Sequence, residues 1–172
     1  MKVDLAFKRK ILDIMVGGHK ISYCAQCGQC NDVCPISHRT GSRYNPKDIV
    51  LFAAMGFRDA LVNNPDPFKI WGCTGCESCD EQCPASIPIT DIILEVKNEM
   101  CKEGKCPPFF IDSTKTIMQE GMAIPSQAAI NKRREQMGLK SAPEGPKEDM
   151  KKLTAALGLD KSLMGEMEGK RR

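Results

Sequence analysis

Two cysteine runs with the same spacing constrain this chain more than any other feature of its sequence. Each run reads C-x2-C-x2-C-x3-C-P, and the cysteines are Cys24, Cys27, Cys30 and Cys34, then Cys73, Cys76, Cys79 and Cys83. Three cysteines at intervals of three residues let a short loop curl around one face of a bound group. The proline after the fourth cysteine fixes φ and suits the first turn of a helix, so the last thiolate points away from its own three neighbours.

Soft sulfur ligands at this spacing are typical of bacterial two-cluster ferredoxins. In those proteins the first three thiolates of a run hold one [4Fe-4S] cluster and the fourth reaches the cluster of the other run. Structural zinc sites use C-x2-C pairs separated by a longer loop, and disulfide frameworks suit small secreted chains. A third cysteine beside each pair would crowd a tetrahedral zinc ion. We therefore expect two [4Fe-4S] clusters, with zinc or disulfides as the alternatives.

Cysteine usage and hydropathy indicate a cytoplasmic protein. Of the ten cysteines, eight belong to the two runs, which favours a reducing compartment over a disulfide scaffold. The first eight residues carry charges where a signal peptide would have its apolar core. The longest uncharged apolar run, residues 49–57, is too short to cross a bilayer. We expect no membrane association.

The charge of the chain gives no reason to expect nucleic acid as a partner. The formal net charge is +3, and eight thiolates with two oxidised clusters would bring it to about −1. Aromatic residues make up only 5% of the sequence, whereas single-strand binders need aromatic stacking platforms.

Helical periodicity precedes the first cysteine run. Residues 5–16 form an amphipathic pattern, with Asp4 as a plausible N-cap and the Gly17-Gly18 pair as a stop. The apolar positions of this pattern are Phe7, Ile11, Ile14 and Met15. An N-terminal helix is therefore predicted.

A second helix is predicted between the runs and a third after them. Asn45-Pro46 opens the second, which Asn63-Asn64-Pro65 ends, and its apolar residues are Ile49, Phe52, Ala53, Phe57, Ala60 and Leu61. Pro88 and Thr90 introduce the third, which fades at Gly104 and has Ile89, Ile92, Ile93, Val96 and Met100 on its inner face. Helices that follow equivalent runs indicate an internal repeat with a pseudo-twofold axis.

The fold class that follows is all-α: a helical ferredoxin domain with two C-x2-C-x2-C-x3-C-P cluster loops and an extended C-terminal arm. No convincing alternating strand pattern occurs. Residues 1–106 are expected to form the two-cluster domain, including the N-terminal helix. Because metal binding is coupled to folding where no preformed site exists, we expect the metal-free chain to be largely unfolded.

Residues 107–172 differ from the preceding residues in their sequence pattern. Pro107-Pro108 breaks the chain ahead of Phe109 and Phe110, two aromatics expected to be exposed, and short helical patterns follow at 113–120, 126–137 and 147–157. These segments have too few apolar residues for a core of their own. We expect an arm that packs on partner subunits, with disorder as the alternative. The basic stretches 132–134 and 170–172 are read as solvated charge, or as contacts to an acidic partner surface.

Few residues outside the runs suggest chemistry. Neither a glycine-rich nucleotide loop nor a Ser, His and Asp set is present, and His19 and His38 are the only imidazoles. Cys101 and Cys106 fit neither run and receive no role. The chain therefore has no predicted catalytic residue, and electron transfer is the activity it favours.

Two aromatic residues closely precede the cysteine runs. Tyr23 stands just before Cys24, and Trp71 lies two residues before Cys73. Such rings can shield a cluster from water and tune its potential, although ordinary packing explains them equally well.

The segments Y-C-A-Q-C-G-Q-C at 23–30 and W-G-C-T-G-C at 71–76, with the Asn45-Pro46 helix between them, resemble the C subunit of heterodisulfide reductase from methanogenic archaea, an iron-sulfur protein. Stretches 108–112 and 121–125 are similar to the C-terminal portion of the same family. The resemblance covers nearly the whole chain.

This resemblance implies an electron relay without a substrate site. In that family, the A subunit holds flavin, the C subunit relays electrons, and the B subunit reduces the disulfide of coenzyme M and coenzyme B in methanogenesis. A hydrogenase or formate dehydrogenase is associated with the complex. A C subunit that is not fused to a B subunit favours the soluble form of the enzyme. The implied ligands are Cys24, Cys27, Cys30 and Cys83 for the first cluster, and Cys73, Cys76, Cys79 and Cys34 for the second.

Other functions remain open at this stage. Iron-sulfur subunits of other dehydrogenases and of sulfur-metabolism complexes contain a similar helical module, but they usually add a third cluster motif or a catalytic domain. A free, diffusible ferredoxin is the remaining alternative, and the C-terminal arm argues against it.

Overall fold

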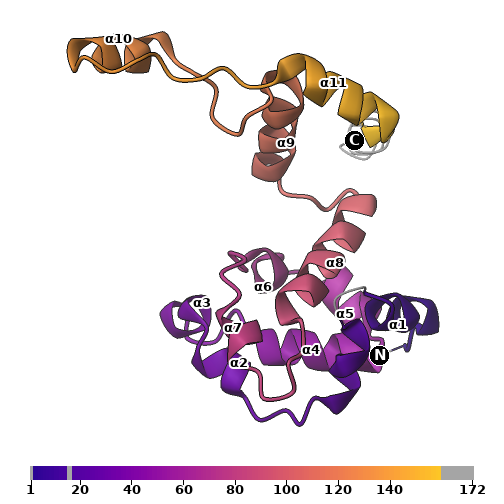
Figure 1. Ribbon diagram of the computed structural model, residues 1–172. Coiled ribbons are helices and arrows are strands. Elements are labelled where there is room, and N and C mark those ends of the chain that lie inside the picture. The colour runs from indigo at the N-terminus through magenta and orange to yellow at the C-terminus, as the bar shows by residue number, and fades with distance from the viewer. Residues whose placement is uncertain (1, 15–16, 160–172) are drawn as a thin grey trace. The chain divides into compact units, whose positions relative to one another are not determined.

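The computed structural model describes residues 2–14 and 17–159, and every regular element in this part of the chain is helical (Figure 1). The prediction of an all-α fold is confirmed. The chain divides into two compact units, Met1–Cys101 and Lys102–Arg172. Among the described residues, no helix is both long and apolar enough to pass through a bilayer.

The first unit consists of short helices followed by one long one. They are α1 (Leu5–Leu12), the 3-10 helix η1 (Gly18–Tyr23), α2 (Gln29–Asp32), α3 (Pro35–Arg39), α4 (Pro46–Met55), α5 (Arg58–Val62), α6 (Phe68–Trp71), α7 (Ser78–Glu81) and α8 (Ile89–Lys102). The cysteine runs lie in the loops that join the short helices, and α4 and α8 follow the two runs.

The N-terminal helix begins as predicted and ends earlier. The Asp4 carboxylate accepts a hydrogen bond from the Phe7 amide at 2.9 Å, which is an N-cap. Phe7 and Ile11 are buried. The helix stops at Leu12, and Ile14 packs against the core from the turn that follows, which is why the apolar spacing placed the end too late. Met15 lies outside the described residues.

The prediction of a single helix between the runs is wrong, because this segment forms two helices, α4 and α5. Gly56 adopts a left-handed conformation with φ of +74° and caps α4. Its carbonyl oxygen accepts a hydrogen bond from the Asp4 amide at 2.8 Å, so the start of α1 lies against this turn. A Cβ at Gly56 would lie 2.9 Å from the Asp4 carbonyl oxygen. A tertiary contact therefore requires the break that helical spacing does not reveal.

The helix predicted after the second run matches α8 closely. Its five predicted inward residues are all buried, with 2% of their surface exposed or less. They belong to the same hydrophobic cluster as Ile49, Val50 and Ala53 of α4. The helices that follow the two cysteine runs thus contribute to one core.

An ion network attaches α1 and α5 to the outer side of α8. The Glu99 carboxylate, only 12% exposed, lies 2.5 Å from Lys10 Nζ and 3.1 Å from the Arg58 guanidinium. Lys10 Nζ also lies 2.8 Å from Glu95. One partly buried carboxylate on α8 is therefore shared by cations from two other helices.

The second unit consists of α9 (Pro108–Glu120), α10 (Ala128–Gln136) and α11 (Lys147–Ala156). The helix predicted at 113–120 begins five residues earlier, because Pro108 occupies its first turn. Helices α9 and α11 contact each other, and Lys147 Nζ lies 2.6 Å from the Glu120 carboxylate. Within the described part of the three helices, only Ile111 and Thr154 are buried.

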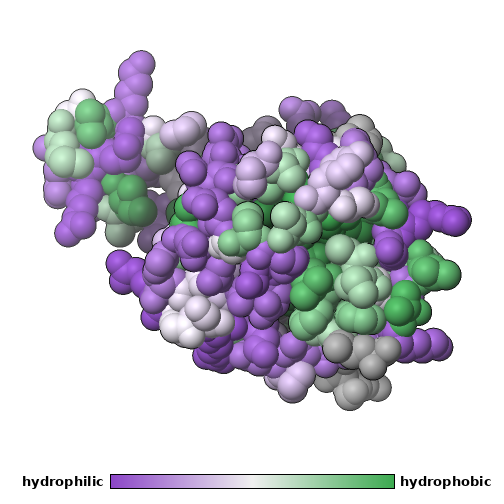
Figure 2. Space-filling view, turned by 90° about the horizontal axis from the view of Figure 1, so that it is seen from below, coloured by the Kyte–Doolittle hydropathy of each residue, from purple (hydrophilic) through white to green (hydrophobic). Residues whose placement is uncertain are grey.

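Large apolar side chains remain exposed on both units. Phe109 is 73% exposed and Phe110 39%, as predicted. Other exposed apolar residues include Ile124, Met137, Leu153 and Leu157 in the second unit, and Val3, Leu5, Leu51, Met55 and Leu94 in the first. On the face that Figure 2 shows, hydrophobic residues gather in an area bordered by hydrophilic ones. Lys132 and Arg133 are exposed, and residues 170–172 lie outside the described residues.

Candidate metal centres

The two cysteine loops are built alike. Helix η1 leads into Cys24 and α6 leads into Cys73, and each loop continues into a four-residue helix, α2 or α7, that contains the third cysteine. Helices α2 and α7 contact each other. The equivalent parts of the two runs therefore meet, as the predicted pseudo-twofold relationship requires.

Both loops turn through left-handed backbone conformations at the same two positions. In the first loop these positions are Gln26 and Gly28, with φ of +56° and +89°. In the second they are Gly75 and Glu77, with φ of +69° and +61°. Each loop has glycine at one of the two positions and tolerates a strained residue at the other. Residues 25–29 and 74–78 thereby curve around the space between their cysteines.

The first cavity brings together thiols from both runs. Cys24, Cys27 and Cys30 line it together with Cys83, the last cysteine of the second run. Burial raises the pKa of Cys30 to about 11, and the charges of Cys24, Cys27 and Cys83 add to this effect. Val50, with Pro84, Ala85, Ile87 and Ile89, forms an apolar wall.

The second cavity has the reciprocal composition. Cys73, Cys76 and Cys79 line it together with Cys34 of the first run. Burial raises the pKa of Cys79 to about 12, and the neighbouring Asp80 carboxylate raises it further. Hydrogen bonding by Ser78 lowers the pKa of the more exposed Cys76.

Tyr44 lines the second cavity. The residue is 2% exposed, and its side chain is hydrogen-bonded to Cys73. Burial raises the pKa of the phenol, and the charges of Cys73, Cys34 and Cys79 act in the same direction. A neutral phenol is therefore held against the thiols of this set.

Hydrogen-bond donors reach sulfur in both cavities. The Gln26 side-chain amide donates to Cys24 Sγ at 3.2 Å, and the Ile87 amide donates to Cys83 Sγ at 3.4 Å. In the second cavity, the Ser37 amide lies 3.5 Å from Cys34 Sγ, where the cysteine caps α3. Donors to thiolate sulfur stabilise the charged ligand form and tune cluster potentials.

The donor sets fit iron-sulfur clusters. Each cavity offers four thiols, the ligand type that [4Fe-4S] clusters use, and apolar side chains on its walls. All ten cysteines lie among the described residues, and none of them forms a disulfide. In the described part of the chain, no three His, Cys, Asp or Glu side chains are grouped to hold a single metal ion.

Comparison with known proteins agrees with this geometry. Residues 20–87 match the family model described as a 4Fe-4S dicluster domain. The C subunit of the H2:CoB-CoM heterodisulfide,ferredoxin reductase from Methanothermobacter thermautotrophicus is 30% identical over 167 residues, which cover 94% of this chain and 86% of that protein. This chain belongs to the family of heterodisulfide reductase C subunits.

Two further relatives support the assignment. The C subunit of the ferredoxin/F420H2-dependent CoB-CoM heterodisulfide reductase from Methanosarcina acetivorans is 35% identical over 73% of this chain and 74% of that protein. A protein from Archaeoglobus profundus that is described as like the heterodisulfide reductase C subunit is 26% identical over 87% of this chain and 78% of that protein. The similarity to this family extends well beyond the cysteine runs.

Most of the other residues that the sequence of this heterodisulfide reductase family member singles out lie outside the two cysteine cavities. His19 and His38 are exposed and line neither cavity, and Cys101 and Cys106 also lie outside both. Tyr23 lines the first cavity although it is 70% exposed. Trp71 packs against the core instead.

Sequence reasoning missed Tyr44 and Lys97. Tyr44 lies in the irregular segment before α4, where no periodicity marks it as buried. Lys97 lies on α8, where a lysine among polar residues is normally solvated. It is half-buried, and its Nζ donates to the Cys73 carbonyl oxygen at 2.8 Å.

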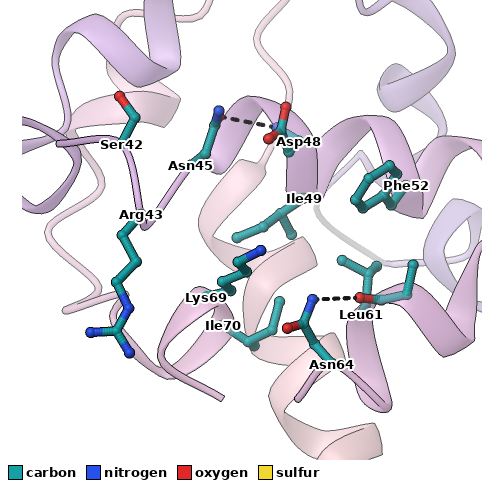
Figure 3. Close-up of a pocket in the computed structure, with 11 residues that line it drawn as sticks. Ser42, Arg43, Asn45, Asp48, Ile49, Phe52, Leu61, Asn64, Lys69 and Ile70 are labelled. Atoms are coloured by element: carbon teal, nitrogen blue, oxygen red, sulfur yellow. Dashed lines mark hydrogen bonds between the residues drawn. The ribbon is translucent and has the colours of Figure 1, made fainter. Parts of the chain in front are cut away.

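A further cavity in the first unit contains no cysteine (Figure 3). Ile49, Leu61 and Ile70 supply its apolar side, and the Asn64 side chain at its edge donates to the Ala60 carbonyl oxygen. Arg43 points away from the other labelled side chains, and its guanidinium binds the Asp66 carboxylate through two nitrogens. We assign this cavity no ligand.

Proposed function

We propose that this chain is the electron-relay subunit of a heterodisulfide reductase complex and carries two [4Fe-4S] clusters. The proposed ligands are Cys24, Cys27, Cys30 and Cys83 for the first cluster and Cys73, Cys76, Cys79 and Cys34 for the second. The observation that supports this most strongly is the reciprocal lining of the two cavities, each with three thiols of one run and the fourth of the other.

Such clusters supply reversible one-electron redox chemistry at potentials set by nearby charge, hydrogen bonds and solvent access. The thiols of this chain bind and orient them, and Val50, Ile87 and Ile89 keep water from one side of the first cavity. Cys27 and Cys76 are exposed, so each set has one ligand at the protein surface, where electrons can enter or leave. No residue of the chain is assigned to substrate.

The proposed partners are the other members of the complex. Electrons would pass from a flavin-containing A subunit, through this chain, to the B subunit that reduces the disulfide of coenzyme M and coenzyme B. A hydrogenase or formate dehydrogenase would supply them, in the cytoplasm of a methanogen. Relatives are named for H2, for H2 or formate, and for ferredoxin or F420H2, so the electron source differs within the family.

The C-terminal segment, residues 107–172, is proposed to pack on these partner subunits. Its helices bury only Ile111 and Thr154 among the described residues, while Phe109, Ile124 and Leu157 are more than half exposed. Large exposed apolar patches mark protein interaction sites, so we expect these side chains to lie against a partner subunit.

Iron analysis and spectroscopy of the reduced protein test the proposal. The anaerobically prepared full chain should contain about eight iron and about eight sulfide, and its electron paramagnetic resonance spectrum should show two interacting centres. Zinc, or iron for one cluster only, would refute it. The isolated chain should not reduce the heterodisulfide, and turnover should require the flavin-containing and disulfide-reducing subunits. A stable monomer that never copurifies with flavin-containing or hydrogenase subunits would favour a diffusible ferredoxin.

A further inference from the structure

Lys97 is held beside a cysteine of the second set. Its Nζ donates to the Cys73 carbonyl oxygen at 2.8 Å and stands 5.5 Å from the centre of the Trp71 ring. The side chain is half-buried on α8. Two contacts and partial burial fix this ammonium group in place, whereas most lysines extend into solvent.

The position of Lys97 allows its charge to act on the second set of cysteines. Burial lowers the pKa of Lys97, and the charge of the nearby Cys73 acts in the opposite direction. A cation that is partly removed from water interacts with a nearby charge more strongly than an exposed cation does. Lys97 is therefore placed to favour additional negative charge in the cavity that Cys73 lines.

The first half of the repeat has no counterpart to Lys97. Aligning the Asp48-Ile49 pair of α4 with the Asp91-Ile92 pair of α8 in the sequence places Ala54 opposite Lys97. The same offset relates Tyr44 to Ile87 and Lys47 to Thr90, and each of these residues lines a cysteine cavity. In this alignment the position of Lys97 has no charged equivalent in the first half.

Other charges lie near the two cavities. The Asp80 carboxylate accepts a hydrogen bond from Cys79 Sγ at 3.3 Å. Its negative charge acts against the positive charge of Lys97 at the second centre. Asp80 also accepts from the Thr90 amide and hydroxyl, so its charge is partly compensated. Lys47 lines the first cavity. Because the first cavity has a lysine of its own in its lining, the inference about Lys97 is drawn for the second centre alone.

We propose that Lys97 raises the reduction potential of the iron-sulfur centre held by Cys73, Cys76, Cys79 and Cys34. This rests on the proposed function, since it presumes that centre. In the complex one electron enters from the flavin-containing subunit, and in the test it comes from dithionite; no bond forms or breaks. The added negative charge is stabilised by the fixed ammonium group, so Lys97 is a positioning and tuning residue for electron transfer.

The test is a potentiometric titration of the full chain, followed by electron paramagnetic resonance. Lys97→Met keeps an apolar contact for Trp71 and removes the charge. We expect one of two midpoint potentials to fall, with reduction disfavoured about tenfold, or about 59 mV for a one-electron couple. Cys76→Ser removes an exposed ligand of the second set, so the signal that is lost in this variant belongs to the second centre. The matched control, Lys69→Met, removes an equal but exposed charge from α6 and should move neither potential.

Two further variants separate charge from structure. Lys97→Arg retains the charge and should keep the potential near the wild-type value, whereas Lys97→Gln retains a donor for the Cys73 carbonyl and should lower it. If Lys97→Met loses the second centre, this pair decides. Equal potentials in the wild type and Lys97→Gln overturn the inference. A wild-type chain without two iron-sulfur centres would instead refute the proposed function.

Discussion

Cys83 closes the second cysteine run and yet lies in the same cavity as Cys30 of the first run, where its charge contributes to the raised pKa of the Cys30 thiol. The reciprocal residue, Cys34, lines the cavity of the second run. An exchange of this kind makes each half of the repeat dependent on the other for a complete set of four thiols.

Paired substitutions test this exchange. Cys34→Ser and Cys76→Ser should each remove the second cluster, so the iron content falls from about eight to about four. The double variant should keep about four, because both residues serve one cluster. By contrast, Cys34→Ser combined with Cys27→Ser should lose nearly all iron. Cys106→Ser, outside both cavities, is the control. The opposite pattern for the two double variants would place Cys34 with its own run.

Removal of iron should unfold most of the first unit. The cysteine loops contain only the four-residue helices α2 and α7 as regular structure, and metal binding free energy contributes directly to folding in such sites. After anaerobic chelation, circular dichroism should show a large loss of helix and a broad, non-cooperative thermal transition. Reconstitution with iron and sulfide should restore the original melt. A native-like, cooperative melt of the metal-free chain would contradict this prediction.

The Glu99 network should contribute measurably to stability. Glu99→Gln removes a carboxylate that is 12% exposed and leaves Lys10 and Arg58 without this shared partner. We expect the free energy of unfolding to fall by about 1.5–3 kcal/mol, the range for hydrogen bonds to charged groups. Anaerobic denaturant titration measures it. Asp66→Asn removes the carboxylate of a solvent-exposed ion pair and should have a much smaller, salt-sensitive effect.

Gly56 should tolerate no side chain. Gly56→Ala places a Cβ 2.9 Å from the Asp4 carbonyl oxygen at a residue with φ of +74°. Strain of about 1–3 kcal/mol is expected from the backbone conformation, and the steric contact adds to it. Gly138→Ala has a similar φ of +70° and no atom within 4 Å, so it measures the conformational cost alone. Equal losses of stability in the two variants would show that the contact with Asp4 is unimportant.

Most of the secondary structure could be predicted because its causes are local. The N-cap at Asp4, the proline at the start of α4 and the apolar periodicity of α8 are all readable from neighbouring residues. The division at Gly56 could not be predicted, because it depends on the approach of Asp4 from a distant part of the chain. Helix α9 begins earlier than its apolar pattern for a different reason: proline in its first turn fixes the start.

The sequence by itself determined the donor chemistry, since the spacing of eight thiols and two prolines limits what the loops can hold. Only the tertiary structure decided which side chains surround those thiols. Tyr44 reaches Cys73 across the repeat, and Lys97 reaches the Cys73 carbonyl from a helix 24 positions further along the chain. Spacing along the chain governs loops and helices. Contacts between distant segments depend on how the helices pack around their shared core.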